Sequence, residues 1–311
     1  MTREHKAAPA DTDTGQAAKD AEGAAMSRRI SVRQLVAETP AMSIGFAREL
    51  AAAHEALHIE GMRAAAALEG NPFEVEVRRF GRATATLSAK LSVVEWYNRV
   101  VGLEHQDARA IPEMLEFFRS RGIRARFEIG PAELTSALAL QLAAERVGVE
   151  RIETVVWAPI DALVPPRTSA VVIRPSPLSE LDLFLELWAR GFALPDFLWT
   201  DVKRMRAAWF SVPGFERYVA QIDGEPIACA GLFIHGDIGY LCVSATLPEA
   251  RGRGAQAALI ARRWRDAAAA GCRTVISTTA FGGTSQSNME RAGMRTAHSF
   301  CVWLDYGMPL I

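Results

Sequence analysis

The sequence predicts an α+β protein made of two consecutive domains. A chain of 311 residues is long enough for two domains of ordinary size, and a hydrophobic fraction of 50% can fill two cores. Strand-like and helix-like runs alternate along both halves. In each half a helix ends in Glu-Arg-x-Gly, at Glu145–Gly148 and Glu290–Gly293, and the strand after it ends at Trp157 or Trp303. This repetition favours a divergent duplication.

The expected boundaries follow the composition. Residues 1–29 are rich in Ala, Asp, Lys and Thr and are predicted to form a disordered tail, so Met26 is a second candidate for the start of the protein. The first domain is expected over residues 30–162. A linker containing Pro165-Pro166 covers residues 163–169, and the second domain covers residues 170–311.

Hydrophobic periodicity and turn signals place the elements in order. In the first domain we expect a helix at 42–69, strands at 74–78 and 83–87, a helix at 110–121, a strand at 124–129, a helix at 131–146 and a strand at 151–157. Pro131 suits the first position of its helix. In the second domain we expect a strand at 170–174, helices at 178–190 and 199–210, strands at 217–222, 226–234 and 238–246, a helix from about 257, a strand at 274–279, a helix ending near 291 and a final strand ending at 303.

Composition excludes several classes of function. Lys+Arg 35 against Asp+Glu 36 gives a net charge of -1, which argues against a nucleic-acid-binding surface. No apolar run approaches the ~20 residues of a membrane span, and the N-terminus lacks the apolar core of a secretory signal. The four cysteines lack metal-binding spacing and are expected to be free, buried thiols. A cytoplasmic protein without metal, nucleic acid or membrane as partner is therefore expected, and its oligomeric state stays open, a homodimer included.

The segment Arg251–Gln256 is the most informative part of the chain. It lies between the strand at 238–246 and an alanine-rich helix. The first N–H groups of a helix have no internal partner and carry the positive end of the helix dipole, so they can hold phosphate oxygens. Gly252 and Gly254 allow the backbone to approach a ligand closely, and Arg251 and Arg253 add positive charge.

This segment resembles the pyrophosphate loop of the Gcn5-related N-acetyltransferases (GNAT superfamily), Gln/Arg-x-x-Gly-x-Gly/Ala. Here it reads Arg251-x-x-Gly254-x-Gln256, and Gln256 departs from the small residue of the family. Thr246-x-Pro248 is similar to the family's Val-x-Pro, and Arg291–Met294 is similar to its Lys-Leu-Gly-Phe. The resemblance covers roughly residues 170–311.

The resemblance implies a tandem protein in which each half has a mixed, mostly antiparallel sheet flanked by helices. The first half carries the acidic run Glu104-His-Gln-Asp107 where the loop would be, which indicates a degenerate GNAT-like domain. The second half would move an acetyl group from acetyl-CoA to an unidentified amine by direct attack. Its cofactor-binding residues would be Ser244, Ala245 and Thr246 for the pantetheine, Arg251, Gly252, Arg253, Gly254, Ala255, Gln256 and Ala257 for the pyrophosphate, and Asn288 nearby.

The catalytic groups are less clear from the sequence. The family's tyrosine acid corresponds to Met289 here, and the strands beside the expected acyl site carry no carboxylate. Ser244, Asp196 and Asp201 are the remaining candidates. The absent acid and base favour, as the alternative, a non-catalytic acyl-CoA sensor or interaction module.

Two other motifs compete with this interpretation. His54-Glu-Ala-Leu-His58 matches the zinc motif HExxH, but Ala64 occupies the place of a third ligand, and we interpret the motif as an exposed polar turn of an alanine-rich helix. Gly252-x-Gly254-x-x-Ala257 matches the dinucleotide pattern, but no acidic residue follows at the ribose position. A further interpretation of the chain, as a zinc hydrolase, depends on His54 and His58 alone.

Overall fold

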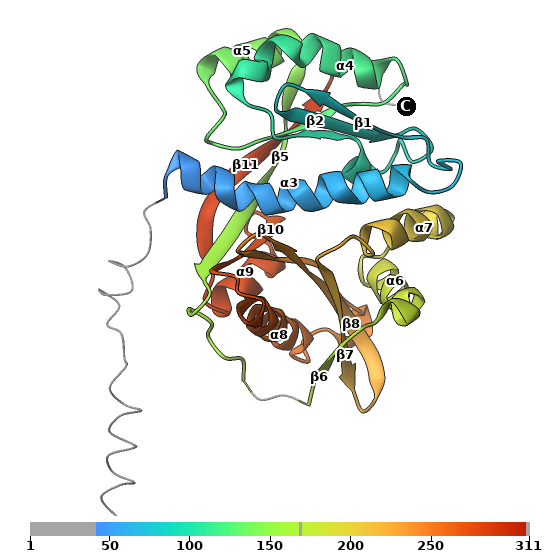
Figure 1. The fold of residues 1–311 in the computed structure, drawn as a ribbon, viewed down its shortest axis with the longest axis vertical. Helices are drawn as coiled ribbons and strands as arrows, with labels where there is room; N and C mark the ends of the chain where they lie inside the picture. The colour runs from blue at the N-terminus through green and yellow to red at the C-terminus, as the bar shows by residue number, and fades with distance from the viewer. Residues whose placement is uncertain (1–41, 168–169, 309–311) are drawn as a thin grey trace, which may run out of the picture. The chain divides into compact units, whose positions relative to one another are not determined.

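One eleven-stranded sheet runs through the chain, with helices packed on it (Figure 1). The computed structural model describes residues 42–167 and 170–308. The predicted tail at 1–29, with Met26, and the first part of the predicted first domain lie outside the described residues. Each half has a mixed, mostly antiparallel set of strands flanked by helices, which confirms the predicted fold class.

The first half contains three elements that the sequence did not predict, the short strand β3 and the 3-10 turns η1 and η2. Helix α5 also begins later than Pro131, because the Thr135 hydroxyl caps it by accepting the Leu138 N–H at 3.2 Å. The elements are α3 (Ile44–Ala66), β1 (Val75–Phe80), β2 (Ala83–Ser88), η1 (Glu95–Tyr97), β3 (Arg99–Val101), η2 (His105–Ala110), α4 (Ile111–Arg119), β4 (Arg126–Ile129), α5 (Ser136–Ala144) and β5 (Val147–Pro159).

The second half follows the predicted order of strands and helices. The predicted turn at Asp223-Gly224 joins two strands, with φ values of 53° and 84° that suit these residue types. The elements are β6 (Val172–Pro175), η3 (Leu178–Glu180), α6 (Leu181–Gly191), η4 (Asp196–Leu198), α7 (Trp199–Trp209), β7 (Phe215–Ile222), β8 (Glu225–His235), β9 (Ile238–Thr246), η5 (Pro248–Ala250), α8 (Ala255–Ala269), β10 (Thr274–Ala280), α9 (Thr284–Arg291) and β11 (Arg295–Asp305).

The two halves exchange their last strands. The strand order is β1-β2-β3-β4-β11-β5-β10-β9-β8-β7-β6. Strand β11 ends the second half but pairs with β4 of the first, and β5 ends the first half but pairs with β10 of the second. The two exchanged strands pair with each other, antiparallel, in the middle of the sheet. Residues 42–311 therefore form one compact unit that contains both halves.

Helix α3 belongs to the core of the second half. It lies across the molecule between the two ends of the sheet in Figure 1 and contacts α7, β8 and β9 as well as β1 and β2. Leu50 and Leu57 are buried in the core cluster that contains α6, α7 and the strands β7 to β10. A second cluster, between α4, α5 and the strands β2 to β4, contains no residue of α3. A helix from the first half thus covers the part of the sheet that contains β8 and β9.

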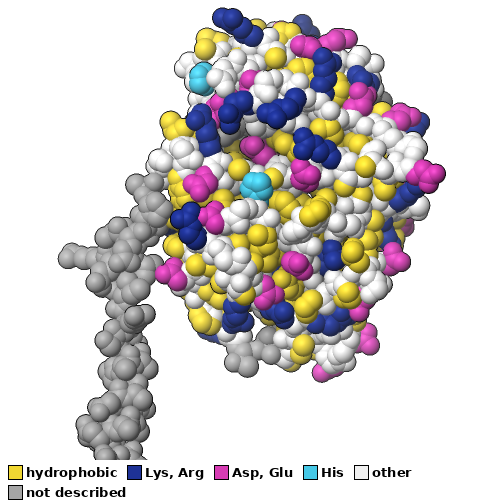
Figure 2. Space-filling view, in the orientation of Figure 1, with side chains coloured by type: hydrophobic (Ala, Val, Ile, Leu, Met, Phe, Trp, Pro, Cys, Tyr) yellow, Lys and Arg dark blue, Asp and Glu magenta, His cyan; other side chains and the backbone are white. Residues whose placement is uncertain are grey.

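None of the described helices is long and apolar enough to cross a bilayer. On the face drawn in Figure 2, acidic and basic side chains are interspersed, as the balanced composition leads one to expect.

Gly61 allows α3 to approach α7, and its replacement tests this contact. A Cβ at Gly61 would lie 2.2 Å from Cδ2 of Trp209, whereas a Cβ at Gly45 of the same helix would meet only the Ser43 hydroxyl, at 3.9 Å. We expect Gly61→Ala to destabilise the protein by about 1–3 kcal/mol through overpacking. Gly45→Ala should be neutral or stabilise by up to about 1 kcal/mol, because alanine favours the helix. Denaturant unfolding measures both, and equal effects of the two changes would contradict this packing.

Candidate functional site

Strands β9 and β10 separate and open a cavity between them. The two strands pair with each other, in parallel, at only three residue pairs, the last of which is Ile276 with Tyr240. Beyond that pair, β10 continues to Ala280 and β9 to Thr246 without pairing with each other. Strand β10 keeps a partner on its other edge, because β5 pairs with it as far as Ala280. Residues from the two ends that have separated from each other line the cavities described below.

A β-bulge turns β9 at the opening. Cys229 of β8 pairs with Ala245, and Gly231 pairs with Cys242, so Val243 and Ser244 face the single residue between them on β8. Val243 has a φ of 50°, which is uncommon for a β-branched residue and marks local strain. The extra residue of a bulge is left out of the ladder. The backbone of β9 at Val243 and Ser244 is therefore left out of the regular ladder with β8, beside the opening.

The predicted pyrophosphate loop lines a cavity of about 500 Å³. Gly254 is the N-cap of α8 with a φ of 86°, a conformation that glycine adopts readily, and nothing lies within 4 Å of a Cβ placed on Gly252. No side chain caps the start of α8, so its first N–H groups face the cavity. Every predicted cofactor residue lines this cavity except Arg253: these are Ser244, Ala245, Thr246, Arg251, Gly252, Gly254, Ala255, Gln256, Ala257 and Asn288.

Gln256, the residue that departs from the family pattern, joins α8 to β9. Its side-chain oxygen accepts the Ser244 hydroxyl at 2.6 Å, and its amide nitrogen donates to the Thr246 hydroxyl at 2.8 Å. These contacts direct the long side chain along the strand. The loop cavity remains open with Gln256 in its wall.

A second cavity, which we call the aromatic cavity, continues from the first and has a volume of about 470 Å³. Phe192, Ser244 and Ser285 line both. Its walls come from both halves of the chain. The residues that define it here are the aromatic side chains of Trp96, Trp188, Phe192, Trp209, Phe210 and Tyr240.

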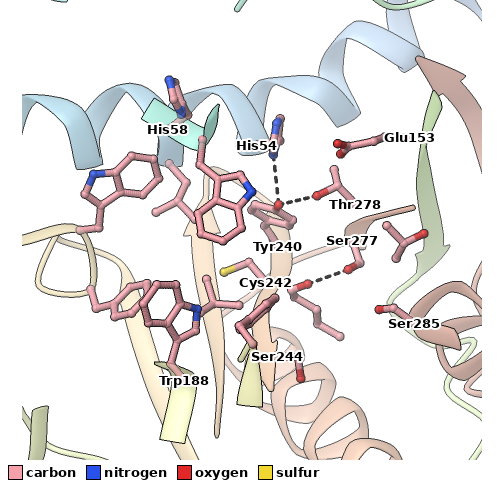
Figure 3. A pocket seen from close by; sticks show the side chains of 18 of the residues that line it. His54, His58, Glu153, Trp188, Tyr240, Cys242, Ser244, Ser277, Thr278 and Ser285 are labelled. Carbon is pink, nitrogen blue, oxygen red and sulfur yellow. Dashed lines mark hydrogen bonds between the residues drawn. The ribbon is translucent and has the colours of Figure 1, made fainter. Parts of the chain in front are cut away.

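A chain of hydrogen bonds leads from a buried carboxylate into the aromatic cavity. Glu128 of β4 lies 3.0 Å from His54 Nε2, and His54 Nδ1 lies 3.1 Å from the Tyr240 hydroxyl. The Tyr240 hydroxyl is 2.7 Å from the Thr278 hydroxyl. Figure 3 shows His54 reaching from α3 toward Tyr240 and Thr278 on the two separated strands. We call Glu128, His54, Tyr240 and Thr278 the relay.

The electrostatics of the relay come from burial and close pairing. Burial opposes the charging of His54, but the charge of Glu128 and the hydrogen bond to it prevail and raise the pKa of His54 above its ordinary value. Burial also opposes the ionisation of Glu128, yet its ion pair with Arg99 and the bond to His54 hold the pKa of that carboxyl well below its usual range. Neutral His54 donates Nε2–H to Glu128 and presents its Nδ1 lone pair to Tyr240.

The relay corrects the interpretation of the HExxH motif as an exposed polar turn. His58 is only 4% exposed, and its Nε2 lies 2.8 Å from the Thr86 hydroxyl. Burial lowers the pKa of His58 well below its ordinary value, while burial raises the pKa of Glu55 to about 7. Since His54 and His58 bond different partners, they do not share a ligand. Within residues 42–167 and 170–308 no group of three or more His, Cys, Asp or Glu side chains could hold a metal.

The other predicted residues lie as follows. Asp196 and Asp201 are exposed and line neither of the two cavities. Met289 is buried in the wall of the aromatic cavity. Cys242 lines the same cavity, and burial raises the pKa of its thiol to about 12, so it stays protonated. All four cysteines are free, three buried as predicted and Cys301 half-buried.

In the first half, carboxylates occupy the position of the loop. The Glu104 side chain and the Asp107 side chain form a capping box at the start of η2. Asp107 also accepts the backbone N–H of Arg82 at 3.2 Å. Two carboxylates thus stand at the start of this helix and accept the backbone N–H groups of Glu104 and Asp107, which disfavours a phosphate there.

Comparisons with known proteins agree with this geometry. Residues 182–293 match the model of the Acetyltransferase (GNAT) family. A GCN5-related N-acetyltransferase from Kribbella flavida is similar in structure, with 15% identity, coverage of 80% of this chain and 96% of that one, and a TM-score of 0.56. A tandem GNAT protein from the clavulanic acid biosynthesis pathway has 14% identity, covers 85% and 97%, and has a TM-score of 0.54. A functionally unknown protein from Staphylococcus epidermidis has 13% identity, covers 78% and 98%, and has a TM-score of 0.55.

At these identities the solved structures establish the fold alone, and no curated protein matches the chain in sequence. The family match stops short of the first half, which joins the second through the exchanged strands and shares the tandem fold. Residues 182–293 are therefore a domain of the Acetyltransferase (GNAT) family, and the chain as a whole shares the fold of a tandem GNAT protein.

Proposed function

We propose that the protein is an N-acetyltransferase that uses acetyl-CoA as donor and a small amine as acceptor. The observation that carries this proposal is the meeting of the two cavities at Ser244. The loop cavity offers unpaired helix N–H groups and arginine for a diphosphate, and the aromatic cavity offers an enclosed space for a second molecule. Because its four cysteines are free thiols, we expect the enzyme to act in the cytoplasm.

The donor would lie along the separated end of β9. Backbone groups of Ser244, Ala245 and Thr246 would bond the pantetheine amides as an added strand would. The bulge at Val243 would direct a backbone N–H toward the thioester carbonyl, where it would stabilise the oxyanion of the tetrahedral intermediate. Gln256 already occupies the hydroxyls of Ser244 and Thr246, so it leaves their backbone groups as the donor contacts.

The relay would supply the base that the sequence lacks. As the amine nitrogen attacks the thioester carbon, its proton passes to Thr278 Oγ1, the Thr278 proton passes to Tyr240, and the Tyr240 proton passes to His54 Nδ1. Glu128 then stabilises the imidazolium that forms. The C–S bond of the intermediate breaks and coenzyme A leaves as a thiolate. Met289 cannot protonate that thiolate, so water in the open cavity would do so.

The alternative is a sensor that binds acyl-CoA without turnover, which Met289 favours. The two functions differ in one measurement, the release of coenzyme A thiol with a panel of primary amines. We expect thiol release that depends on both protein and amine. Saturable acetyl-CoA binding with no amine-dependent release would establish the sensor instead.

Replacement of Gly254 tests the placement of the diphosphate. We expect Gly254→Glu to abolish acetyl-CoA binding in calorimetry, because a carboxylate would enter the anion site at the start of α8. Gly271→Glu is the matched control. Gly271 has the same φ of 86°, ends α8 at its far end and has open space around it, so it carries the same backbone strain away from the site. If Gly254→Glu binds acetyl-CoA as well as the control, the diphosphate lies elsewhere.

The pH dependence of activity tests the relay. Only neutral His54 can accept a proton, so kcat/KM should rise with pH through the raised pKa of His54, with a midpoint above 6.5. Glu128→Gln removes the charge that raises this pKa, and the midpoint should move to lower pH. His54→Gln should lower kcat by about 10²- to 10⁴-fold and leave acetyl-CoA affinity unchanged.

Glu150→Gln provides the control for this experiment. Glu150 accepts its hydrogen bonds from Arg126 and Arg151 and not from a relay residue, so its loss should leave the pH profile in place. An unchanged midpoint in Glu128→Gln, or full activity in His54→Gln, would remove the relay from the mechanism.

A further inference from the structure

Arg206 is a buried cation in the wall of the aromatic cavity. It lies on α7 (Trp199–Trp209), points into the core side of that helix and is only 8% exposed. Its guanidinium carbon lies 4.3 Å from the ring centre of Trp209 and 5.1 Å from that of Tyr97. The rings of Trp96 and Trp188 are each 5.5 Å away. Four aromatic rings thus hold the guanidinium at the cavity.

No carboxylate pairs with Arg206. Its Nε is buried without a hydrogen-bond partner, and no ion pair joins the guanidinium to an acidic side chain in the part of the chain that the structure describes. The nearby Tyr97 hydroxyl makes no hydrogen bond of normal geometry. Arg99, another buried arginine lining this cavity, differs in having an ion pair with Glu128. An arginine stays charged when buried, and an uncompensated buried charge is costly.

The groups around Arg206 leave its charge unbalanced. Burial raises the pKa of Tyr97 and of the Cys242 thiol, so both stay neutral, and burial keeps His58 neutral as well. Glu153, an acidic side chain that lines the cavity, accepts a hydrogen bond from Arg151 at 2.9 Å. The aromatic end of the cavity therefore carries one positive charge that the chain itself does not neutralise.

We propose that Arg206 binds a carboxylate of the molecule that occupies the aromatic cavity. A guanidinium pairs with a planar carboxylate through two parallel hydrogen bonds, and a single unbalanced charge matches a monoanion. The aromatic walls suit the carbon skeleton of the same molecule. This inference rests on the proposed function only in naming the reaction; binding of a carboxylate follows from the cavity alone.

The carboxylate has two chemical sources in an acetyl-transfer reaction. An amino acid acceptor would place its carboxylate at Arg206 and its amine near Thr278, which lines the same cavity across from Trp188 (Figure 3). A dicarboxylic acyl group on coenzyme A would instead extend from Ser244 toward Arg206. The shared chemistry is one carboxylate, and the experiment separates the sources.

Direct binding tests the carboxylate site without any transfer reaction. Calorimetry would compare benzoate with benzamide on the full chain and on Arg206→Gln, Arg206→Lys and Arg204→Gln. We expect the wild-type protein to prefer benzoate, and Arg206→Gln to lose about 10- to 100-fold in benzoate affinity with benzamide unchanged. Arg204 is exposed on the same helix, so its change should have no effect. A benzoate preference that is absent, or that survives in Arg206→Gln, overturns the proposal.

Arg206→Lys keeps the test decisive if the glutamine variant does not fold, because lysine retains the charge and loses the paired geometry. It should keep part of the preference for benzoate. Two further arms then identify the source. Selective loss of kcat/KM for phenylalanine over phenylalaninamide in Arg206→Gln indicates the acceptor, and selective loss of affinity for succinyl-CoA over butyryl-CoA indicates the donor. A protein that ignores acetyl-CoA but keeps the Arg206-dependent preference for benzoate refutes the proposed function and retains this site.

Discussion

The pairing of β5 with β11 is the interaction on which the rest of the structure depends. A cavity between β9 and β10 requires two adjacent strands to part, and a strand that leaves one neighbour needs another to satisfy its backbone. Strand β5 supplies that neighbour along the whole of β10, and β11 in turn holds β5. The wall of the proposed acyl site in the second half therefore rests on a strand encoded in the first half.

The division of roles between the halves follows from this arrangement. The second half keeps the glycine-bearing loop whose backbone can hold a diphosphate. In the first half Glu104 and Asp107 occupy the corresponding position, but that half contributes Glu128, His54 and Trp96 around the second half's cavity. Glu128 is buried between Arg99 and His54, and such a network holds its members rigidly because every partner compensates the burial of another. The degenerate half is thus part of the proposed active site.

The sequence predicted what depends on local pattern. Hydrophobic periodicity and turn residues placed nearly all helices and strands, and the loop at Arg251–Gln256 was recognised from glycine spacing beside a strand and a helix. The relay was missed because its four members are spread along the chain from His54 to Thr278, and only the tertiary fold brings them together. The HExxH motif marked His54, yet its spacing suggested a metal, and the zinc interpretation competed only with an exposed turn. The sequence also gave no sign that β5 and β11 would exchange, since each reads as an ordinary strand.

The exchange has a consequence for how such a chain could arise. Two identical copies of a single half, each lending its last strand to the other, would form a symmetric swapped dimer with two equivalent clefts. Joining the copies in one polypeptide fixes the partners permanently and frees one cleft from selection. The copy whose cleft is not needed can then change so that it supports the other copy. Such a history would account for the difference between the two helix starts in this protein, Asp107 in the first half and Gly254 in the second.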